Sequence, residues 1–302
     1  MYHNIEIVGM RKNRDLRIVI TIIILAIISI IVCLGIIFYN KQNNSLEVAS
    51  TNNLKTEETV NTEKSENNEA TNYDSNDQTV EVSKEQKEFI NKVENIYNGE
   101  DGKRVFLTFD DGPSTEVTPK ILDILKKYNI KATFFVLGNR VKANPDLVKR
   151  EYEEGHYIAN HGYSHKYSKI YESANSVLEE YNKTEVEIRK VLGNEGYSSY
   201  LFRFPGGSKG GPYEKIKKEA RKKLKENGIA YIDWSALTYD AEGANTKEEI
   251  LKNLKETIKG WDNVVVLMHD AADKKITYET LEDVIKYLQD EGYAFKNMYD
   301  LK

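Results

Sequence analysis

The hydrophobic pattern divides the chain into stretches of very different character. Residues 18–39 form an unbroken apolar run, IVITIIILAIISIIVCLGIIFY. Residues 40–83 contain hardly any large apolar side chain, whereas from residue 102 onward short apolar runs alternate with amphipathic stretches. This pattern predicts a tail at 1–17, a membrane helix at 18–39, a flexible linker at 40–83, a connecting helix within 84–101 and one domain at 102–302.

The apolar run has the length of a membrane-spanning helix, which needs about 20 apolar residues. A cleaved signal peptide usually has a shorter apolar region of about 7–15 residues that ends in small residues, and a buried core helix would show a polar face. We therefore favour an uncleaved anchor. Basic residues precede it: Arg11, Lys12, Arg14 and Arg17. The positive-inside tendency predicts a cytoplasmic N-terminus and an extracytoplasmic domain on a single-pass cell-membrane protein.

The linker is rich in Asn, Ser, Thr and Glu, so it cannot bury enough apolar surface to offset the entropy of ordering. We interpret it as a disordered tether. Ser83 to Tyr97 reads as a helix that connects the tether to the domain.

Strands and helices alternate through the domain. Apolar runs predict strands at 104–111, 132–138, 157–161, 200–204, 229–234, 263–268 and 293–295. Amphipathic stretches predict helices at 118–128, where Thr118-Pro119 begins a capped helix, and at 144–155, 173–192, 213–227, 246–259 and 278–290. Such alternation predicts the α/β class with a mainly parallel sheet, and the number of strands favours an irregular α/β barrel. Chemistry in such barrels collects at the carboxyl ends of the strands.

Composition narrows the function. The 302 residues carry a net charge of −5, which predicts no nucleic-acid partner and suits a neutral sugar polymer. The single cysteine, Cys33, excludes an intramolecular disulfide. We expect a monomer.

Carboxylates and histidines follow two of the predicted strands. Asp110 and Asp111 close the first strand before Gly112, where they could serve a turn or a catalytic site. His161 and His165 follow the third strand, and imidazole pairs with carboxylate around zinc-like ions. A lone His-x-x-x-His is more often a surface feature, but two histidines and one aspartate would leave ligand positions open for water and substrate.

Two further strand ends carry polar residues. Arg203 precedes Phe-Pro-Gly-Gly, where backbone N–H groups could face a developing oxyanion. The alternative is an ordinary loop with a structural Arg–Asp pair. His269 ends a continuous apolar strand and is a candidate general acid, with a satisfied core histidine as the alternative. His156 precedes its strand, at the inactive end, and we assign it a structural role. Together the four strand ends indicate a metal-assisted hydrolase.

These motifs resemble the polysaccharide deacetylase family (carbohydrate esterase family four, with its NodB homology domain), over residues 103 to 300. Thr108-Phe-Asp-Asp111 is similar to the first family motif, which implies Asp110 as catalytic base and Asp111 as metal ligand. His161 to His165 is similar to the second motif and implies two further ligands, although Gly162 replaces the usual Ser or Thr. The resemblance implies a divalent metal, with zinc expected and cobalt or a similar ion as alternatives.

The remaining motifs imply the rest of the site. Arg203-Phe-Pro is similar to the third motif, whose arginine orients the base. Gly206 stands where the family often has a Tyr that lends its backbone N–H to the oxyanion. Leu267-Met-His269 implies Leu267 in the acetyl pocket and His269 as the acid.

The fourth motif departs most from the family pattern. Trp234 to Asp240 fits it, but Ala241 replaces a second Trp. We assign Asp240 as the residue that tunes His269 and keep Asp233 as a lesser candidate.

The resemblance is strongest to membrane-anchored peptidoglycan deacetylases. A tethered extracytoplasmic enzyme meets its own wall first, so the expected substrate is peptidoglycan, with chitin oligomers or acetylated xylan as alternatives. A catalytically silent wall-binding module and a phosphomonoester hydrolase are the competing functions. The residues of the site argue against the first, and the lack of a basic phosphate clamp argues against the second.

Overall fold

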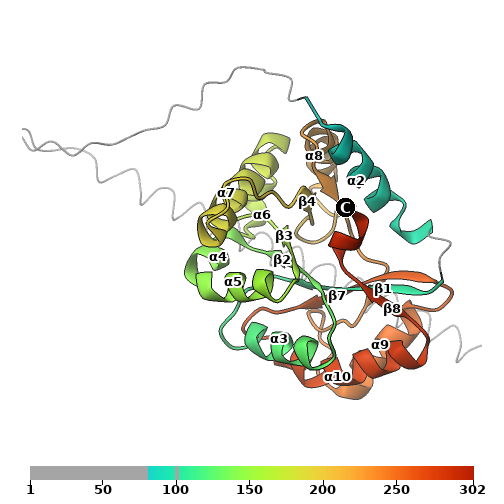
Figure 1. Cartoon of the computed structure of the whole chain (residues 1–302). Coiled ribbons are helices and arrows are strands. Elements are labelled where there is room, and N and C mark those ends of the chain that lie inside the picture. The colour runs from blue at the N-terminus through green and yellow to red at the C-terminus, as the bar shows by residue number, and fades with distance from the viewer. Residues whose placement is uncertain (1–80, 99–101) are drawn as a thin grey trace, which may run out of the picture. The chain divides into compact units, whose positions relative to one another are not determined.

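The computed structural model describes residues 81–98 and 102–302 (Figure 1). The predicted tail, the predicted anchor at 18–39 and nearly all of the predicted linker lie outside these residues. Within the described part, none of the helices combines the length and the apolar character that crossing a bilayer requires.

Helix α2 (Lys84–Glu94) is the predicted connecting helix, and η1 (Ile96–Asn98) follows it. It begins with a capping box in which the Ser83 side chain accepts from the Gln86 N–H and the Gln86 side chain accepts from the Ser83 N–H. Phe89 and Val93 are one turn apart and both buried. Phe89 stacks on Tyr157, with ring centroids 6.4 Å apart, so α2 is docked against the sheet.

The sheet is parallel throughout, as the sequence predicts. Its strands are β1 (Arg104–Asp110), β2 (Thr133–Val136), β3 (Tyr157–Asn160), β4 (Leu201–Phe202), β5 (Ala230–Tyr231), β6 (Ala236–Leu237), β7 (Asn263–His269) and β8 (Ala294–Lys296). The order is β5-β4-β3-β2-β1-β7-β6, and β8 pairs with the first half of β1. No pairing joins β5 to β6 within residues 102–302. The structure therefore confirms the α/β class and the parallel sheet, and it corrects the expected irregular barrel to a curled half-barrel.

The helices lie between successive strands. They are α3 (Thr118–Lys127), α4 (Gly138–Ala143), α5 (Pro145–Glu153), α6 (Tyr167–Ile170), α7 (Ala174–Leu192), α8 (Glu214–Glu226), α9 (Lys247–Thr257) and α10 (Lys275–Asp290), with η2 (Met298–Leu301) at the end. All six predicted domain helices are present. Three short elements, α4, α6 and β6, are absent from the sequence prediction because two to six residues are too few to show a period.

Strand alternation divides the core into two layers. In β1, Val105, Leu107 and Phe109 pack against the outer helices, including α3, α9 and α10. Phe106 points to the other face, where it packs with residues of α2 and η2. Because successive side chains point to opposite faces, Asp110 shares the inner face with Phe106. The apolar outer layer thus fixes which carboxylate enters the interior.

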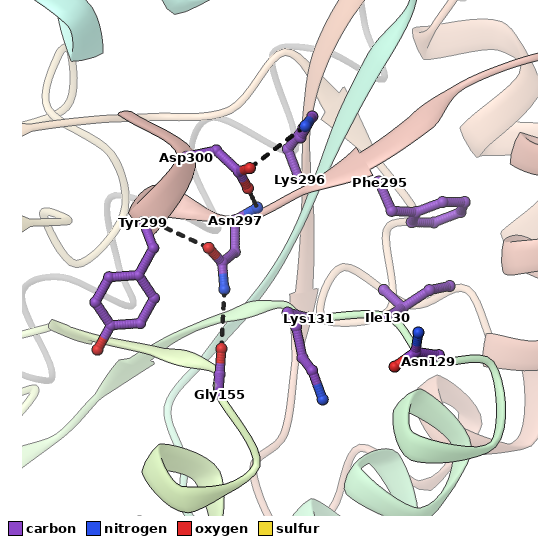
Figure 2. A pocket seen from close by; sticks show the side chains of 9 residues that line it. All are labelled: Asn129, Ile130, Lys131, Gly155, Phe295, Lys296, Asn297, Tyr299 and Asp300. Atoms are coloured by element: carbon purple, nitrogen blue, oxygen red, sulfur yellow. Dashed lines mark hydrogen bonds and ion pairs between the residues drawn. The ribbon is translucent and has the colours of Figure 1, made fainter. Parts of the chain in front are cut away.

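A cavity of about 420 Å³ lies at the amino ends of β2 and β3, beside β8 and η2 (Figure 2). Asn297 organises it: its side-chain N–H donates to the Gly155 carbonyl at 3.1 Å, and its side-chain oxygen accepts from the Tyr299 N–H at 3.0 Å. Asp300 caps the same turn through the Asn297 N–H at 2.8 Å. These bonds tie the last turn of the chain to the loop before β3.

Candidate metal centre and catalytic site

Strands β1 and β7 bring two predicted catalytic residues side by side. Their parallel register pairs Asp110 with His269. Asp110 is 2% exposed and His269 is 9% exposed, so both lie at the edge of the interior. The backbone continues the ladder one residue further, because the Asp270 N–H donates to the Asp110 carbonyl at 3.0 Å.

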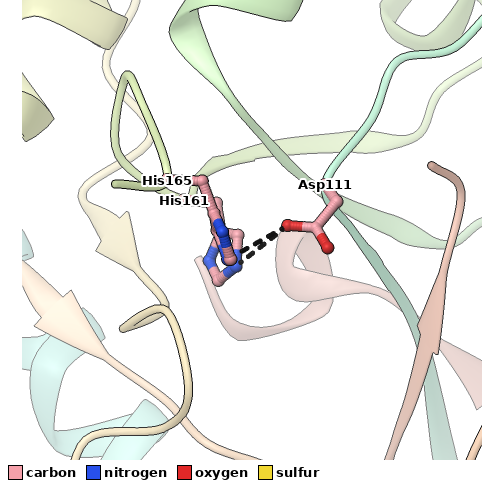
Figure 3. Close-up of side chains that lie close together, drawn as sticks. All are labelled: Asp111, His161 and His165. Carbon is pink, nitrogen blue, oxygen red and sulfur yellow. Dashed lines mark ion pairs between the residues drawn. The ribbon is translucent and has the colours of Figure 1, made fainter. Parts of the chain in front are cut away.

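Asp111, His161 and His165 lie together at the same edge of the sheet (Figure 3). The structure thus confirms that these three predicted ligands are neighbours. The Asp111 Oδ1 lies 3.5 Å from His161 Nε2 and 3.4 Å from His165 Nε2. Each of the three residues offers one potential ligand atom, and these three atoms all lie within 4.8 Å of one another. Figure 3 shows the carboxylate facing both imidazole rings.

The chemistry of these three donors fits a divalent cation. The Asp111 Oδ1 is buried and has no hydrogen-bond partner within the described residues. His161 Nδ1 lies 2.8 Å from the Arg203 carbonyl, so it carries the proton and leaves a lone pair on Nε2. Two atoms that bind one zinc ion at about 2.1 Å with tetrahedral geometry lie about 3.4 Å apart. The observed separations match that value.

Burial keeps His161 in the form that a metal requires. The buried environment disfavours the imidazolium and lowers the pKa of His161 to about 3, although the nearby Asp111 carboxylate opposes this shift. The ring is therefore neutral at physiological pH. A neutral ring with a fixed tautomer is ready to bind a cation without losing a proton.

The loop between the two histidines is held by a carboxylate that the sequence analysis missed. Glu180 of α7 accepts the N–H groups of Tyr163 and Ser164, both at 2.7 Å. Gly162 has φ +83°, and a Cβ there would lie 3.0 Å from Ile170 Cδ1. The glycine that departs from the family pattern thus fits the tight path of this loop.

The predicted base and its arginine form a buried ion pair. The Arg203 Nη1 donates to Asp110 Oδ1 at 2.8 Å and to Thr108 Oγ1 at 2.7 Å. The guanidinium also lies over the Phe135 ring, 3.9 Å from its centroid. Burial raises the pKa of Asp110, and the charge of Arg203 opposes that rise. The other oxygen, Oδ2, lies 3.7 Å from His161 Nε2 and so faces the cluster.

His269 is held by the aspartate that the fourth motif singled out. Asp240 Oδ1 lies 3.0 Å from His269 Nδ1, and Asp240 Oδ2 accepts the His269 N–H at 2.7 Å. Thr277 of α10 donates to the same oxygen at 2.7 Å. Burial disfavours the imidazolium, but the hydrogen bond and charge of Asp240 prevail and raise the pKa of His269 to about 9. His269 is therefore protonated at neutral pH.

The loop that contains Gly206 and Gly207, here called the Gly-rich loop, presents a free backbone N–H donor. Gly206 is exposed, with φ +69°, and its N–H has no hydrogen-bond partner in the described part of the chain. The carbonyl of the same peptide, that of Pro205, accepts from the Tyr171 hydroxyl at 2.6 Å. Lys217 Nζ donates to the Gly206 carbonyl at 3.3 Å. These two bonds fix the direction of the Gly206 N–H.

Three other predicted residues lie close to Arg203, on β7 or at the Gly-rich loop. Trp234 places its ring 5.9 Å from the Arg203 guanidinium, and Leu267 is 3% exposed on the same face of β7 as His269. Asp233, the lesser candidate for tuning His269, instead accepts the N–H and hydroxyl of Ser208 at 2.8 and 2.6 Å. It supports the Gly-rich loop.

A cluster of potential metal ligands, with a buried proton acceptor and a protonated imidazole beside it, is the arrangement that a metal-assisted hydrolase needs. The chain belongs to the polysaccharide deacetylase family, whose members hydrolyse N-acetyl amide bonds. The family model described as polysaccharide deacetylase matches residues 97–232.

Relatives and solved structures agree with this assignment. The chain is 36% identical over 210 residues to a peptidoglycan-N-acetylglucosamine deacetylase of Listeria monocytogenes, a match that covers 70% of this chain and 41% of that protein. It is 30% identical over 227 residues to a peptidoglycan-N-acetylmuramic acid deacetylase of Bacillus subtilis, covering 75% of this chain and 82% of that protein. A carbohydrate esterase family four structure from Streptococcus mutans superposes with a TM-score of 0.62 at 33% identity, covering 69% of this chain and 90% of that one.

Proposed function

We propose that this chain removes N-acetyl groups from the amino sugars of peptidoglycan, with a divalent metal ion held by Asp111, His161 and His165. One observation carries the proposal. Asp110 and His269 pair across β1 and β7, with Asp110 Oδ2 facing the metal cluster and His269 held protonated by Asp240. This arrangement supplies a proton acceptor and a proton donor at one reaction centre.

A cation held by Asp111, His161 and His165 would supply Lewis acidity and would lower the pKa of a water molecule, so that its hydroxide form could attack an amide at neutral pH. Asp110 takes the proton from that water, since its Oδ2 faces the cluster while its Oδ1 is tied to Arg203. Arg203 favours the charged form of the carboxylate, against the effect of burial, and fixes its orientation. Asp110 is therefore the general base.

Two groups act on the acetamide of the substrate. The Gly206 N–H has no partner within residues 102–302 and donates to the oxyanion that forms when the carbonyl is attacked. His269 then delivers its proton to the nitrogen of the leaving amino sugar. Leu267, on the same strand face as His269, borders the space for the acetyl methyl group. The products are acetate and a free amino sugar.

The choice of peptidoglycan rests on the relatives and on the predicted anchor. One relative is named for N-acetylglucosamine and the other for N-acetylmuramic acid, so either sugar is consistent with the proposal. The apolar run at 18–39 supports a membrane-anchored enzyme with its domain outside the cell. Chitin oligomers and acetylated xylan are the alternative substrates. Zinc is the proposed metal, because its ligands are typically histidine and carboxylate.

The test is acetate release from purified peptidoglycan by the full-length chain. We expect release to stop when a chelator removes the metal and to return when zinc or cobalt is restored. His165→Ala should lose bound metal, as measured by elemental analysis, whereas Lys166→Ala, an exposed neighbour, should retain it. Wall binding without acetate would contradict the proposal in favour of a silent module. Phosphate release from phosphomonoesters would contradict it in favour of the other hydrolase.

A further inference from the structure

The hydroxyl end of Tyr167 lies beside the α-carbon of Gly206. Tyr167 is the first residue of α6, two residues after the metal ligand His165. A Cβ built on Gly206 would lie 2.5 Å from the Tyr167 hydroxyl oxygen and 3.2 Å from its Cζ. The hydroxyl end of Tyr167 therefore occupies the space that a side chain at position 206 would need.

The ring of Tyr167 also borders the metal cluster. It packs edge-on against the His165 ring, with centroids 5.6 Å apart. Its side chain is 39% exposed, so solvent and a polymer can reach it. Within the described part of the chain its hydroxyl makes no hydrogen bond. A partly exposed tyrosine with an unused hydroxyl thus lies between a metal ligand and the oxyanion donor.

Two further tyrosine rings pack against the ring of Tyr167. The centroid of Tyr171 lies 5.7 Å from that of Tyr167, and the centroid of Tyr213 lies 6.3 Å from it. Tyr171 is itself fixed, because its hydroxyl donates to the Pro205 carbonyl. The same side chain that orients the Gly206 peptide therefore supports Tyr167. The position of Tyr167 relative to the Gly206 N–H is set by shared packing.

We propose that Tyr167 contacts the substrate and forms the wall of the groove above the Gly206 N–H. This inference rests on the proposed function. Its hydroxyl can donate to and accept from sugar hydroxyl groups, and its ring supplies an apolar surface that packs against His165, Tyr171 and Tyr213. Gly206 is the matching feature, because a Cβ at this position would force the Tyr167 side chain to shift. Tyr167 thus selects which sugar can place its acetamide against the donor.

Binding and turnover separate this role from a structural one. The probe is a soluble tetramer of β-1,4-linked N-acetylglucosamine, with binding measured in the inactive Asp110→Asn background of the full-length chain. Tyr167→Phe removes one hydrogen bond and should weaken binding about three- to ten-fold. Tyr167→Ala also removes the wall and should weaken binding about ten- to hundred-fold, with a matching rise in KM in the active chain.

Matched variants guard against an indirect effect. Tyr152 has a similar exposed fraction, 36%, on α5, and Tyr152→Ala should leave Kd and KM unchanged. Gly206→Ala should impair turnover through its clash with Tyr167 and through its backbone conformation. The same change made in Tyr167→Ala should cost less, because only the conformational part remains.

The outcomes distinguish the two proposals. If both Tyr167 variants bind and turn over the tetramer as the wild type does, the role of Tyr167 is wrong and the proposed function stands. If the wild type binds the tetramer through Tyr167 but releases no acetate from it or from peptidoglycan, the proposed function is wrong and the role of Tyr167 stands. A wild-type chain that neither binds nor deacetylates the tetramer contradicts the inference itself.

Discussion

The two ends of the same parallel sheet differ in how their polar groups are used. At the carboxyl ends, Asp111 and His165 have positive φ values of 78° and 55°, and the Asp111 Oδ1 is buried without a hydrogen-bond partner in the described residues. At the amino ends, Asn297 uses both its side-chain oxygen and its side-chain N–H in hydrogen bonds, to the Tyr299 N–H and to the Gly155 carbonyl (Figure 2). His156, at this end, accepts the Ala132 N–H at 3.0 Å, and burial lowers its pKa to about 4.

From this difference we associate the carboxyl ends of the strands with catalysis and the amino ends with stability. Strained backbone and unmatched polar atoms are tolerated where a ligand or substrate will satisfy them. The amino ends also hold a residue with positive φ, Asn129, and a buried atom without a partner, His156 Nε2, but among the described residues no group of potential metal ligands lies there. We therefore expect substitutions at the carboxyl ends of the strands to reduce activity more than stability. Substitutions at the amino ends should reduce stability more than activity.

The largest effect should follow Asp110→Asn. The amide preserves the shape of the side chain but cannot accept the proton of the attacking water, so kcat should fall about 100- to 10,000-fold. Bound metal should remain, because Asp111 and both histidines are intact. Acetate release and elemental analysis measure the two quantities. The control Asp123→Asn changes a 71% exposed carboxylate on α3 and should leave both unchanged. Near-normal turnover by Asp110→Asn would remove Asp110 from the role of base.

The next effect concerns pH and is produced by Asp240→Asn. The acid form of His269 is the active one, so activity should decline as pH rises through about 9 in the wild type. Without the carboxylate, the pKa of His269 should return to 6.5 or below, and activity at pH 8 should fall about 30-fold from loss of protonation alone. A pH profile of kcat measures this. Thr277→Val keeps the charge of Asp240 and should shift the alkaline limb less. An alkaline limb that stays in place in Asp240→Asn would contradict the assignment of His269 as the acid.

The smallest effect on activity should come from Asn297→Ala, at the amino ends. This change leaves the Gly155 carbonyl and the Tyr299 N–H without their partner, which should lower the free energy of unfolding by about 1–3 kcal/mol. Denaturant unfolding measures the loss, and kcat/KM below the unfolding transition should match the wild type. A strong loss of kcat/KM in a folded Asn297→Ala chain would mean that the two ends of the sheet are not functionally separate.

Much of the site followed from where apolar runs end. The run Arg104 to Phe109 fixes both the strand and its faces, so the sequence could predict that Asp110 and Asp111 serve different partners. The spacing of His161 and His165 after a strand was enough to predict the cluster. The family motifs were needed to assign Asp240. Nothing in the residues around it indicates a contact with His269, which lies 29 residues further along the chain.

The supporting residues could not be predicted in the same way. Glu180 lies in the amphipathic helix α7 and Tyr171 directly follows the short helix α6, and both side chains bind backbone atoms that no residue pattern identifies. Thr118 was expected to cap α3, but its hydroxyl donates to Asp270 at 2.6 Å, and Val117 occupies the cap position without a side-chain bond. Tertiary contacts decided these roles. The open edge between β5 and β6 likewise depends on pairing, which strand counts do not determine.

The most direct test is the mass of peptidoglycan fragments after treatment with the full-length, metal-loaded chain. Wall material is incubated with the wild type or with Asp110→Asn, digested to single muropeptides and measured by tandem mass spectrometry. We expect muropeptides that lack one acetyl group on an identified amino sugar after wild-type treatment, and none beyond background after Asp110→Asn treatment. Fully acetylated muropeptides after treatment with the folded wild type would contradict the proposed function.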